Sequence, residues 1–143
     1  MSTIDDCRLI QLPKIDRPQG SITPVEGGTT IPFEIARVYY VYDIVLGASR
    51  GGHAHRRLQQ LIVSVMGRFV VTIDDGQRGR SVELDRADRG LYIPTMIWRE
   101  LVHFSSGAIC VVLASLPYDE ADYIRDVDEY RSLKVGARTD TGR

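Results

Sequence analysis

Short apolar stretches separated by turn residues recur along most of the chain. They are rich in β-branched and aromatic residues, which favour strands, and few repeat with the 3.6-residue period of a helix. The stretches predicted as strands are 9–12, 20–25, 35–46, 60–66, 68–73, 81–84, 90–93 and 108–114, with 94–100 as a loop or strand start. This spacing predicts an all-β sandwich or barrel.

The longest predicted strand, 35–46, alternates between two faces. Arg37 and Tyr39 share one face while Val38 and Tyr40 share the other, and the pattern leaves open which face is internal. The pattern changes after residue 117. Residues 118–133 are predicted to form short helical or irregular turns laid over the barrel.

The composition fits one domain over 1–143, with a core over about 8–133 and a flexible tail over 134–143. A net charge of -1 with 26% charged residues favours neither nucleic acid nor a membrane surface as a partner. The longest apolar run, 108–114, is far shorter than the roughly 20 residues of a membrane helix, and the first residues lack the features of a secretory signal. The isolated Cys7 and Cys110 favour a reducing cytoplasm.

Two of the three histidines stand one residue apart in the stretch Arg50-Gly51-Gly52-His53-Ala54-His55. Alternate residues of a strand share a face, so both imidazoles are expected to point into one space. The glycines before them predict a tight turn. Together with Gly47, Gln60 and Gly67, the pair resembles the first motif of the cupin superfamily. The resemblance implies a small β-barrel (jelly roll) whose interior holds two histidines and a glutamate.

Two residues that would bind a cupin metal are replaced in this chain. Gln60 stands at the glutamate position, and Arg99 stands at the histidine position of a second motif over 90–99. A guanidinium cannot ligate a metal, and two imidazoles alone leave a divalent ion under-coordinated. We therefore expect no metal and no cofactor, with the pocket retained.

Without a metal, His53 and His55 are candidates for acid–base chemistry. An imidazole titrates near neutral pH and can take a proton from carbon and return it. A purely structural pair is the alternative. Arg50, just before the pair, favours chemistry because a guanidinium suits an anionic group such as a diphosphate.

Several motifs resemble, in the same order, the sugar 3,4-ketoisomerases, cupins that act on dTDP-4-oxo-6-deoxyglucose. They are residues 31–33, 37–43, 50–55, 90–93, 98–100, 104–106, 112–115 and 118–125. The last, Tyr118-Asp119-Glu120-Ala121-Asp122-Tyr123-Ile124-Arg125, is the most specific, because general cupin physics does not require it.

The resemblance implies a homodimeric, metal-free isomerase that moves the ketone from C4 to C3 of a dTDP-sugar in deoxyaminosugar biosynthesis. It assigns the catalytic roles to His53, His55 and Tyr39. The residues expected to contact substrate are Arg50, Arg37, Arg17, Trp98, Arg99 and Glu100. The chain departs from the family at 18–20, where members have Arg-Gly, and at Arg99, where many have histidine.

The chemistry is compatible with these residues. The hydrogen on C3, alpha to the C4 ketone, is acidic enough for a neutral imidazole if the enediolate is stabilised. The sequence does not decide which histidine is the base, although the nearness of His53 to Arg50 favours it. A nucleotide-sugar 3,5-epimerase and a non-catalytic sugar-binding cupin stay open as alternatives, as do the configuration at C4 and the preferred nucleotide.

Overall fold

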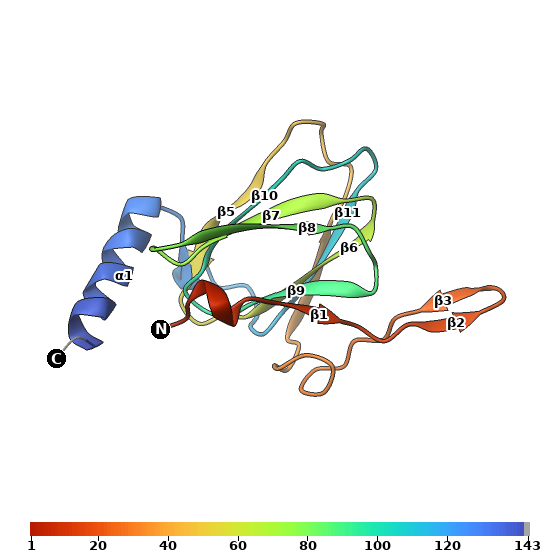
Figure 1. The fold of residues 1–143 in the computed structure, drawn as a ribbon, viewed down its shortest axis with the longest axis horizontal. Coiled ribbons are helices and arrows are strands. Elements are labelled where there is room, and N and C mark those ends of the chain that lie inside the picture. The colour runs from red at the N-terminus through yellow and green to blue at the C-terminus, as the bar shows by residue number, and fades with distance from the viewer. Residues whose placement is uncertain (142–143) are drawn as a thin grey trace.

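The computed structural model describes residues 1–141, with side chains up to 137. Strands dominate this range and the one α-helix within it lies at the C-terminal end (Figure 1), so the all-β prediction is confirmed. The strands are β1 (Arg8–Gln11), β2 (Ile15–Arg17), β3 (Gly20–Ile22), β4 (Arg37–Val41), β5 (Arg50–His55), β6 (Gln60–Met66), β7 (Phe69–Asp74), β8 (Gly79–Leu84), β9 (Arg89–Ile93), β10 (Trp98–Val102), β11 (Ile109–Ala114) and β12 (Tyr123–Ile124). Two 3-10 helices, η1 (Ile4–Asp6) and η2 (Glu120–Asp122), and α1 (Val127–Thr141) complete the described elements.

Two antiparallel five-stranded sheets form the body of the fold. Their strand orders are β1-β9-β6-β11-β4 and β12-β5-β10-β7-β8, and β2 and β3 pair only with each other in a hairpin that extends away from both sheets (Figure 1). The inner faces enclose one apolar core, which includes Ile62, Phe69, Leu91 and Val112. The outer face of the first sheet is partly covered by the segment from Leu12 to Phe33.

Strand ends and very short strands depart from the sequence prediction. The strand predicted over 35–46 ends at Val41, because Asp43 adopts a left-handed backbone with a φ of 52° and the chain turns there. Strands β2 and β12 were not predicted, and β10 extends to Val102, beyond the predicted 94–100. Segments of two or three residues become strands through their partners, so their own composition gives little signal.

Helix α1 is longer than the short turns predicted for 118–133. Asp126 begins it by accepting hydrogen bonds from the backbone N–H groups of Asp128 and Glu129. The buried Tyr130 hydroxyl lies 2.9 Å from the carbonyl oxygens of both Asp74 and Met96, which share its one proton, and it anchors the helix on the barrel. The predicted tail over 134–143 thus falls on α1 up to Thr141, and residues 142 and 143 lie outside the described range. No helix among the described residues is long and apolar enough to span a membrane.

Candidate active site

A cavity of about 390 Å³ opens between the two sheets, and its lining is strongly cationic. The charged residues that line it are Arg37, Arg50, Arg99 and Arg125; its lining contains no aspartate or glutamate. The whole chain carries a net charge of -1, so positive charge is concentrated here. Such a cavity attracts an anionic ligand.

The two imidazoles meet at this cavity but differ in exposure. Their ring centroids lie 4.7 Å apart and the ring planes are nearly perpendicular, at 88°. His53 is half-buried and lines the cavity, whereas His55 lies behind it, fully buried. Ala54, between them, packs on the opposite side of the sheet in a cluster with Ile124.

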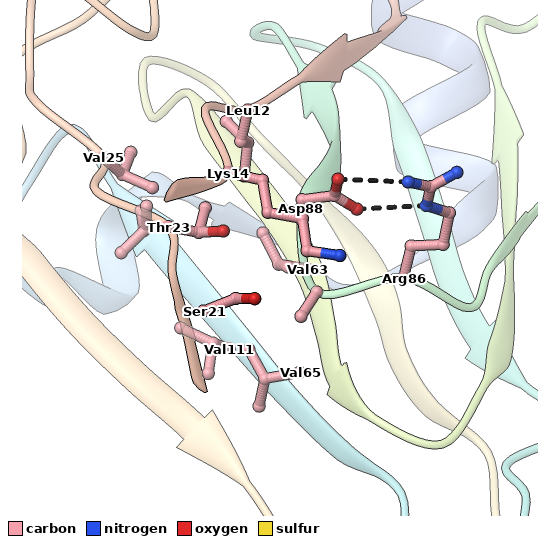
Figure 2. A pocket seen from close by; sticks show the side chains of 12 residues that line it. Leu12, Lys14, Ser21, Thr23, Val25, Val63, Val65, Arg86, Asp88 and Val111 are labelled. Carbon is pink, nitrogen blue, oxygen red and sulfur yellow. Dashed lines mark hydrogen bonds and ion pairs between the residues drawn. The ribbon is translucent and has the colours of Figure 1, made fainter. Parts of the chain in front are cut away.

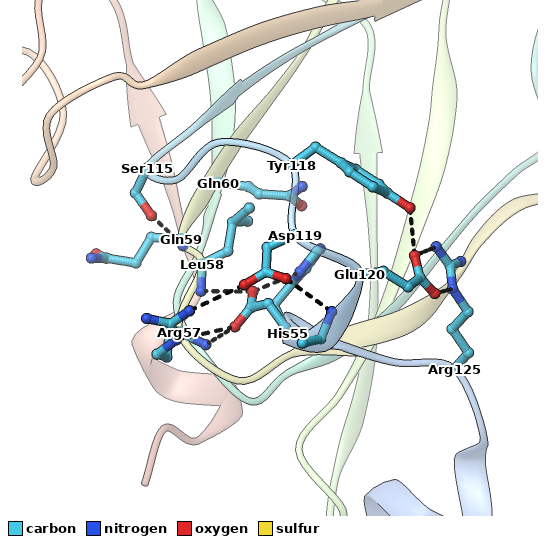
Figure 3. A network of polar contacts seen from close by, with 12 residues as sticks. His55, Arg57, Leu58, Gln59, Gln60, Ser115, Tyr118, Asp119, Glu120 and Arg125 are labelled. Carbon is cyan, nitrogen blue, oxygen red and sulfur yellow. Dashed lines mark hydrogen bonds and ion pairs between the residues drawn. The ribbon is translucent and has the colours of Figure 1, made fainter.

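His55 lies beside Arg57 and Leu58 (Figure 3), and a carboxylate from the C-terminal part of the chain holds its ring. Its Nδ1 lies 3.1 Å from Oδ2 of Asp122. The carboxylate also accepts the backbone N–H groups of Arg57, at 2.7 Å, and Leu58, at 3.2 Å. A carboxylate with these partners accepts hydrogen bonds, so the proton of neutral His55 sits on Nδ1 and Nε2 keeps its lone pair.

The Nε2 atoms of the two imidazoles are not used in hydrogen bonds within the described part of the chain. Both atoms are buried. Burial, followed by the charge of Arg99, lowers the pKa of His53 to about 3, and the same two causes lower the pKa of His55. Each imidazole is therefore neutral at pH 7 and has the basic form that proton abstraction needs.

Arg99 and Gln60 fill the place of the missing metal ligands. The Arg99 side chain is 1% exposed and donates hydrogen bonds to Gln60 Oε1 and to the carbonyl oxygen of Ile97. Gln60 Nε2 in turn donates to the Tyr39 hydroxyl at 3.3 Å. Burial lowers the pKa of Arg99 to about 10, which leaves it charged at neutral pH. The cavity thus contains a buried cation whose hydrogen-bond partners are neutral.

The residues present do not fit a metal. Arg99 repels a cation, and within the described part of the chain no group of three or more His, Cys, Asp or Glu residues could hold an ion.

The predicted site residues lie in three separate places. Besides His53 and Arg99, the cavity is lined by Arg37, Tyr39 and Arg50. Trp98 and Glu100 alternate with Arg99 along β10 and face the outer side of the sheet, where they line a separate groove of about 700 Å³. Arg17 is exposed on the β2–β3 hairpin and does not line the cavity.

The segment 118–125, called the strap below, supplies residues that were not assigned roles from the sequence. Tyr123 lies against both imidazoles, with ring centroids 5.0 Å from His53 and 4.4 Å from His55, and it lines the cavity. β12 pairs Tyr123 with His55, which fixes the strap to β5. The specific tail motif was the available signal, but no local pattern places it beside the histidines.

Comparisons with known proteins identify the family of this chain. Residues 5–135 match the family described as FdtA: WxcM-like, C-terminal. The TDP-4-oxo-6-deoxy-alpha-D-glucose-3,4-oxoisomerase of Aneurinibacillus thermoaerophilus is 40% identical over 124 residues, which cover 87% of this chain and 89% of the relative.

Solved structures of sugar 3,4-ketoisomerases have the same fold. QdtA from Thermoanaerobacterium thermosaccharolyticum, in complex with TDP, has a TM-score of 0.91 and 35% identity, covering 94% of this chain and 98% of QdtA. The WlaRB TDP-quinovose 3,4-ketoisomerase from Campylobacter jejuni has a TM-score of 0.87 and 40% identity, covering 90% and 99%. The resemblance inferred from the motifs is thereby confirmed, and the chain belongs to the FdtA (WxcM-like, C-terminal) family, whose named relatives are sugar 3,4-ketoisomerases.

Proposed function

We propose that this protein is an isomerase that moves the ketone from C4 to C3 of dTDP-4-oxo-6-deoxyglucose. The observation that carries the proposal is the cavity itself: four arginines and a neutral imidazole line it, and no carboxylate does. A sugar linked to a nucleoside diphosphate brings the negative charge that such a cavity lacks. The curated relative is named for the corresponding TDP-sugar reaction.

In the proposed mechanism His53 is the base, since it lines the cavity and its Nε2 has no described partner. The C3–H bond breaks, the proton passes to His53, and the electron pair forms the C3=C4 bond of an enediolate with its charge on the C4 oxygen. The hydroxyl proton then moves from the C3 oxygen to the C4 oxygen. Return of the first proton to C4 yields the 3-ketone, so the reaction balances without a cofactor.

The surrounding residues have separate roles in this scheme. Arg99 stabilises the enediolate, because a buried cation with neutral partners interacts strongly with a developing negative charge. Tyr39 lines the cavity next to Gln60 and offers a hydroxyl that can carry the proton between the two oxygens. His55, held by Asp122, positions His53 through the contact between their rings.

Proton NMR of the reaction in deuterated water tests this function against its alternatives. A 3,4-ketoisomerase converts dTDP-4-oxo-6-deoxyglucose to the 3-ketone while C5 keeps its proton. Deuterium at C5 would instead identify a 3,5-epimerase. Binding without any product would identify a non-catalytic sugar-binding cupin. The 3'-monoepimerase ChmJ, at 18% identity and a TM-score of 0.73, shares the fold and does not favour epimerisation here.

The proposal includes a homodimer. β4 is an edge strand, and its outward Val38 and Tyr40 are 55% and 63% exposed. On the outer face of the same sheet, Val63, Val65 and Val111 line a hollow of about 560 Å³, with the charged Lys14, Arg86 and Asp88 also in its lining (Figure 2). A second copy would cover this apolar surface. Light scattering coupled to size exclusion should give twice the 16.1 kDa mass of the chain. A cytoplasmic location is also proposed, supported by the free thiols of Cys7 and Cys110.

A further inference from the structure

The base of the proposed reaction has no polar group that holds its ring. Asp122 fixes the neighbouring His55 through a 3.1 Å contact to Nδ1. No hydrogen bond or salt bridge in the described part of the chain holds the His53 ring, and its Nε2 atom is buried without a partner. A base that turns out of line with the C–H bond loses most of its catalytic effect. The orientation of His53 therefore depends on packing.

Tyr123 supplies that packing from the strap. In the antiparallel pairing of β12 with β5 it stands directly opposite His55. Opposite residues share a face of the sheet, and the diagonal neighbour two places along is within reach of an aromatic side chain. The Tyr123 ring accordingly contacts both imidazoles, with centroids 4.4 Å from His55 and 5.0 Å from His53. Since the imidazoles also touch each other, three rings pack together.

The Tyr123 ring is itself held by the strap. The Arg125 guanidinium lies over it, 4.2 Å from the centroid, and Glu120 fixes that guanidinium through hydrogen bonds of 2.7 and 3.0 Å. The Tyr118 ring packs beside it at 5.7 Å. Among the described side chains, the contacts found for Tyr123 all involve its ring. The ring can therefore orient the histidines without its hydroxyl.

The same ring covers the imidazoles against water. Tyr123 and His53 both line the cavity, and His55 lies fully buried behind them. Burial is the largest cause that lowers the pKa of His53 to about 3, ahead of the charge of Arg99. Loss of the ring would hydrate the imidazole, so the pKa of His53 would rise toward its ordinary value of 6.5.

We propose that Tyr123 is a positioning residue whose ring, and not its hydroxyl, orients the His53 base and excludes water from both imidazoles. The inference deepens the proposed function and rests on it for the identity of the base. It assigns Tyr123 no step in proton transfer. The strap then serves both histidines, because Asp122 holds one and Tyr123 holds the other.

The other ionisable groups around the pair are unchanged when Tyr123 alone is replaced. In the cavity lining and on the strap they are Arg37 and Tyr39 from β4, Arg50 from β5, Arg99 from β10, Cys110 from β11, and Tyr118, Asp119, Glu120, Asp122 and Arg125 from the strap. A change in histidine titration in a Tyr123 variant therefore reports the loss of the ring.

Steady-state kinetics on two variants separate the ring from the hydroxyl. Tyr123→Phe keeps the ring, so its kcat should stay within about threefold of the unmodified protein. Tyr123→Leu removes the ring, and its kcat should fall about 10–100-fold with a smaller change in KM. Circular dichroism verifies folding. An equal loss in Tyr123→Phe would make the hydroxyl the working group and overturn the inference, as would an unchanged kcat in folded Tyr123→Leu.

A proton NMR titration of the histidine rings without substrate tests water exclusion. The chain has three histidines, and the signals of His53 and His55 are identified by their loss in the asparagine variants. Between pH 8 and 5.5 the His53 signal should stay fixed in the unmodified protein and in Tyr123→Phe, and should move in Tyr123→Ala. The exposed His103, outside the cavity lining, is the reference in each spectrum. A fixed His53 signal in folded Tyr123→Ala would overturn the inference.

Tyr92→Ala is the matched control. Tyr92 is also a half-buried strand residue with a guanidinium over its ring, that of Arg8 at 5.6 Å, and with a second ring beside it, that of Phe33 at 6.2 Å. It does not line the cavity. Its replacement should leave kcat and the His53 signal unchanged. Effects equal to those of Tyr123→Ala would show a general loss of packing and overturn the inference.

The NMR titration separates this inference from the proposed function, because it needs no turnover. If the His53 signal moves in Tyr123→Ala but the unmodified protein forms no 3-ketone, the role of Tyr123 in covering the imidazoles stands and the isomerase proposal is wrong. If the 3-ketone forms and folded Tyr123→Ala changes neither kcat nor the titration, the isomerase proposal stands and the Tyr123 assignment is wrong.

Discussion

The Nδ1 atom of His55 lies 3.1 Å from Oδ2 of Asp122, and both side chains are almost completely buried. His53 has no such partner and lines the cavity. The two histidines, one residue apart in the sequence, therefore have different surroundings. This difference leads to distinct predictions for each of them and for the carboxylate.

Replacement of each histidine by asparagine should separate their roles. We expect His53→Asn to lose nearly all turnover and all exchange of the C3 hydrogen with solvent, because it removes the base. His55→Asn should be slowed by about 10²–10³-fold while some exchange persists. Exchange and turnover are measured in deuterated water, with circular dichroism to verify folding. Wild-type turnover in both folded variants would mean that the pair is structural.

Asp122→Asn should reduce kcat about 10–100-fold with little change in KM, since it removes the carboxylate that fixes the ring and tautomer of His55. Asp119→Asn is the control on the same strap. Asp119 accepts the backbone N–H of Ala121 and pairs with Arg57 but does not contact His55. The kcat and KM values of both variants are measured by steady-state kinetics and compared. Equal kcat values in the two would contradict a positioning role for Asp122.

The pH profile of kcat/KM should lack the inflection near pH 6.5 that a solvated histidine base gives. The His53 pKa lies near 3 instead of near 6.5, because of burial and the charge of Arg99. The imidazole therefore stays neutral as the pH falls from 8 to 5.5, and kcat/KM should be flat across this interval. A loss of kcat/KM with a midpoint near 6.5 would show that the base is an ordinary, solvated histidine.

The lowered histidine pKa values should also make the free energy of unfolding decrease as the pH falls. Below pH 6.5 the unfolded chain binds protons at His53 and His55, whereas the folded chain does not. The free energy of unfolding therefore has its full value above pH 6.5 and decreases as the pH falls toward 3. Each histidine contributes a slope of at most about 1.4 kcal/mol per pH unit. Urea unfolding at pH 7 and pH 5 measures it, and His53→Asn should show a smaller difference. An equal difference in His53→Asn would mean that His53 titrates normally.

Exhaustive chelation should leave turnover unchanged. Gln60 and Arg99 occupy two positions that would otherwise bind a metal, and Arg99 donates a hydrogen bond to Gln60 there. Activity is assayed after dialysis against a chelator, with metal content measured in parallel. Loss of turnover that one divalent ion restores would contradict the metal-free mechanism.

The sequence predicted well what depends on local pattern. β6 agrees with its predicted bounds, 60–66, because its apolar run ends at a turn whose Gly67 has a φ of 71°. Placement of the two histidines followed from strand alternation. The same alternation, applied to β10, would have separated Trp98 and Glu100 from Arg99 and predicted their position on the outer face.

Contacts between distant segments could not be predicted. Asp122 reaches His55 across 67 positions of the chain, and no local pattern encodes that distance. The strap residues Tyr123 and Arg125 enter the site for the same reason, through the pairing of β12 with β5. Sequence motifs identified the segment, and the topology of the sheets determined where it lies.

The pair formed by Gln60 and Arg99 constrains how this barrel can change during evolution. Glutamate at position 60 alone would face the Arg99 guanidinium and form a buried ion pair with it. Histidine at position 99 alone would remove that cation and add a third imidazole to His53 and His55, and three histidines are a ligand set that holds zinc in catalytic sites. A return to metal binding therefore requires a change at position 99 first, because the cation must be removed before a carboxylate at position 60 can serve as a ligand. A substitution at position 60 alone does not create a metal site, so the order of the two changes is constrained.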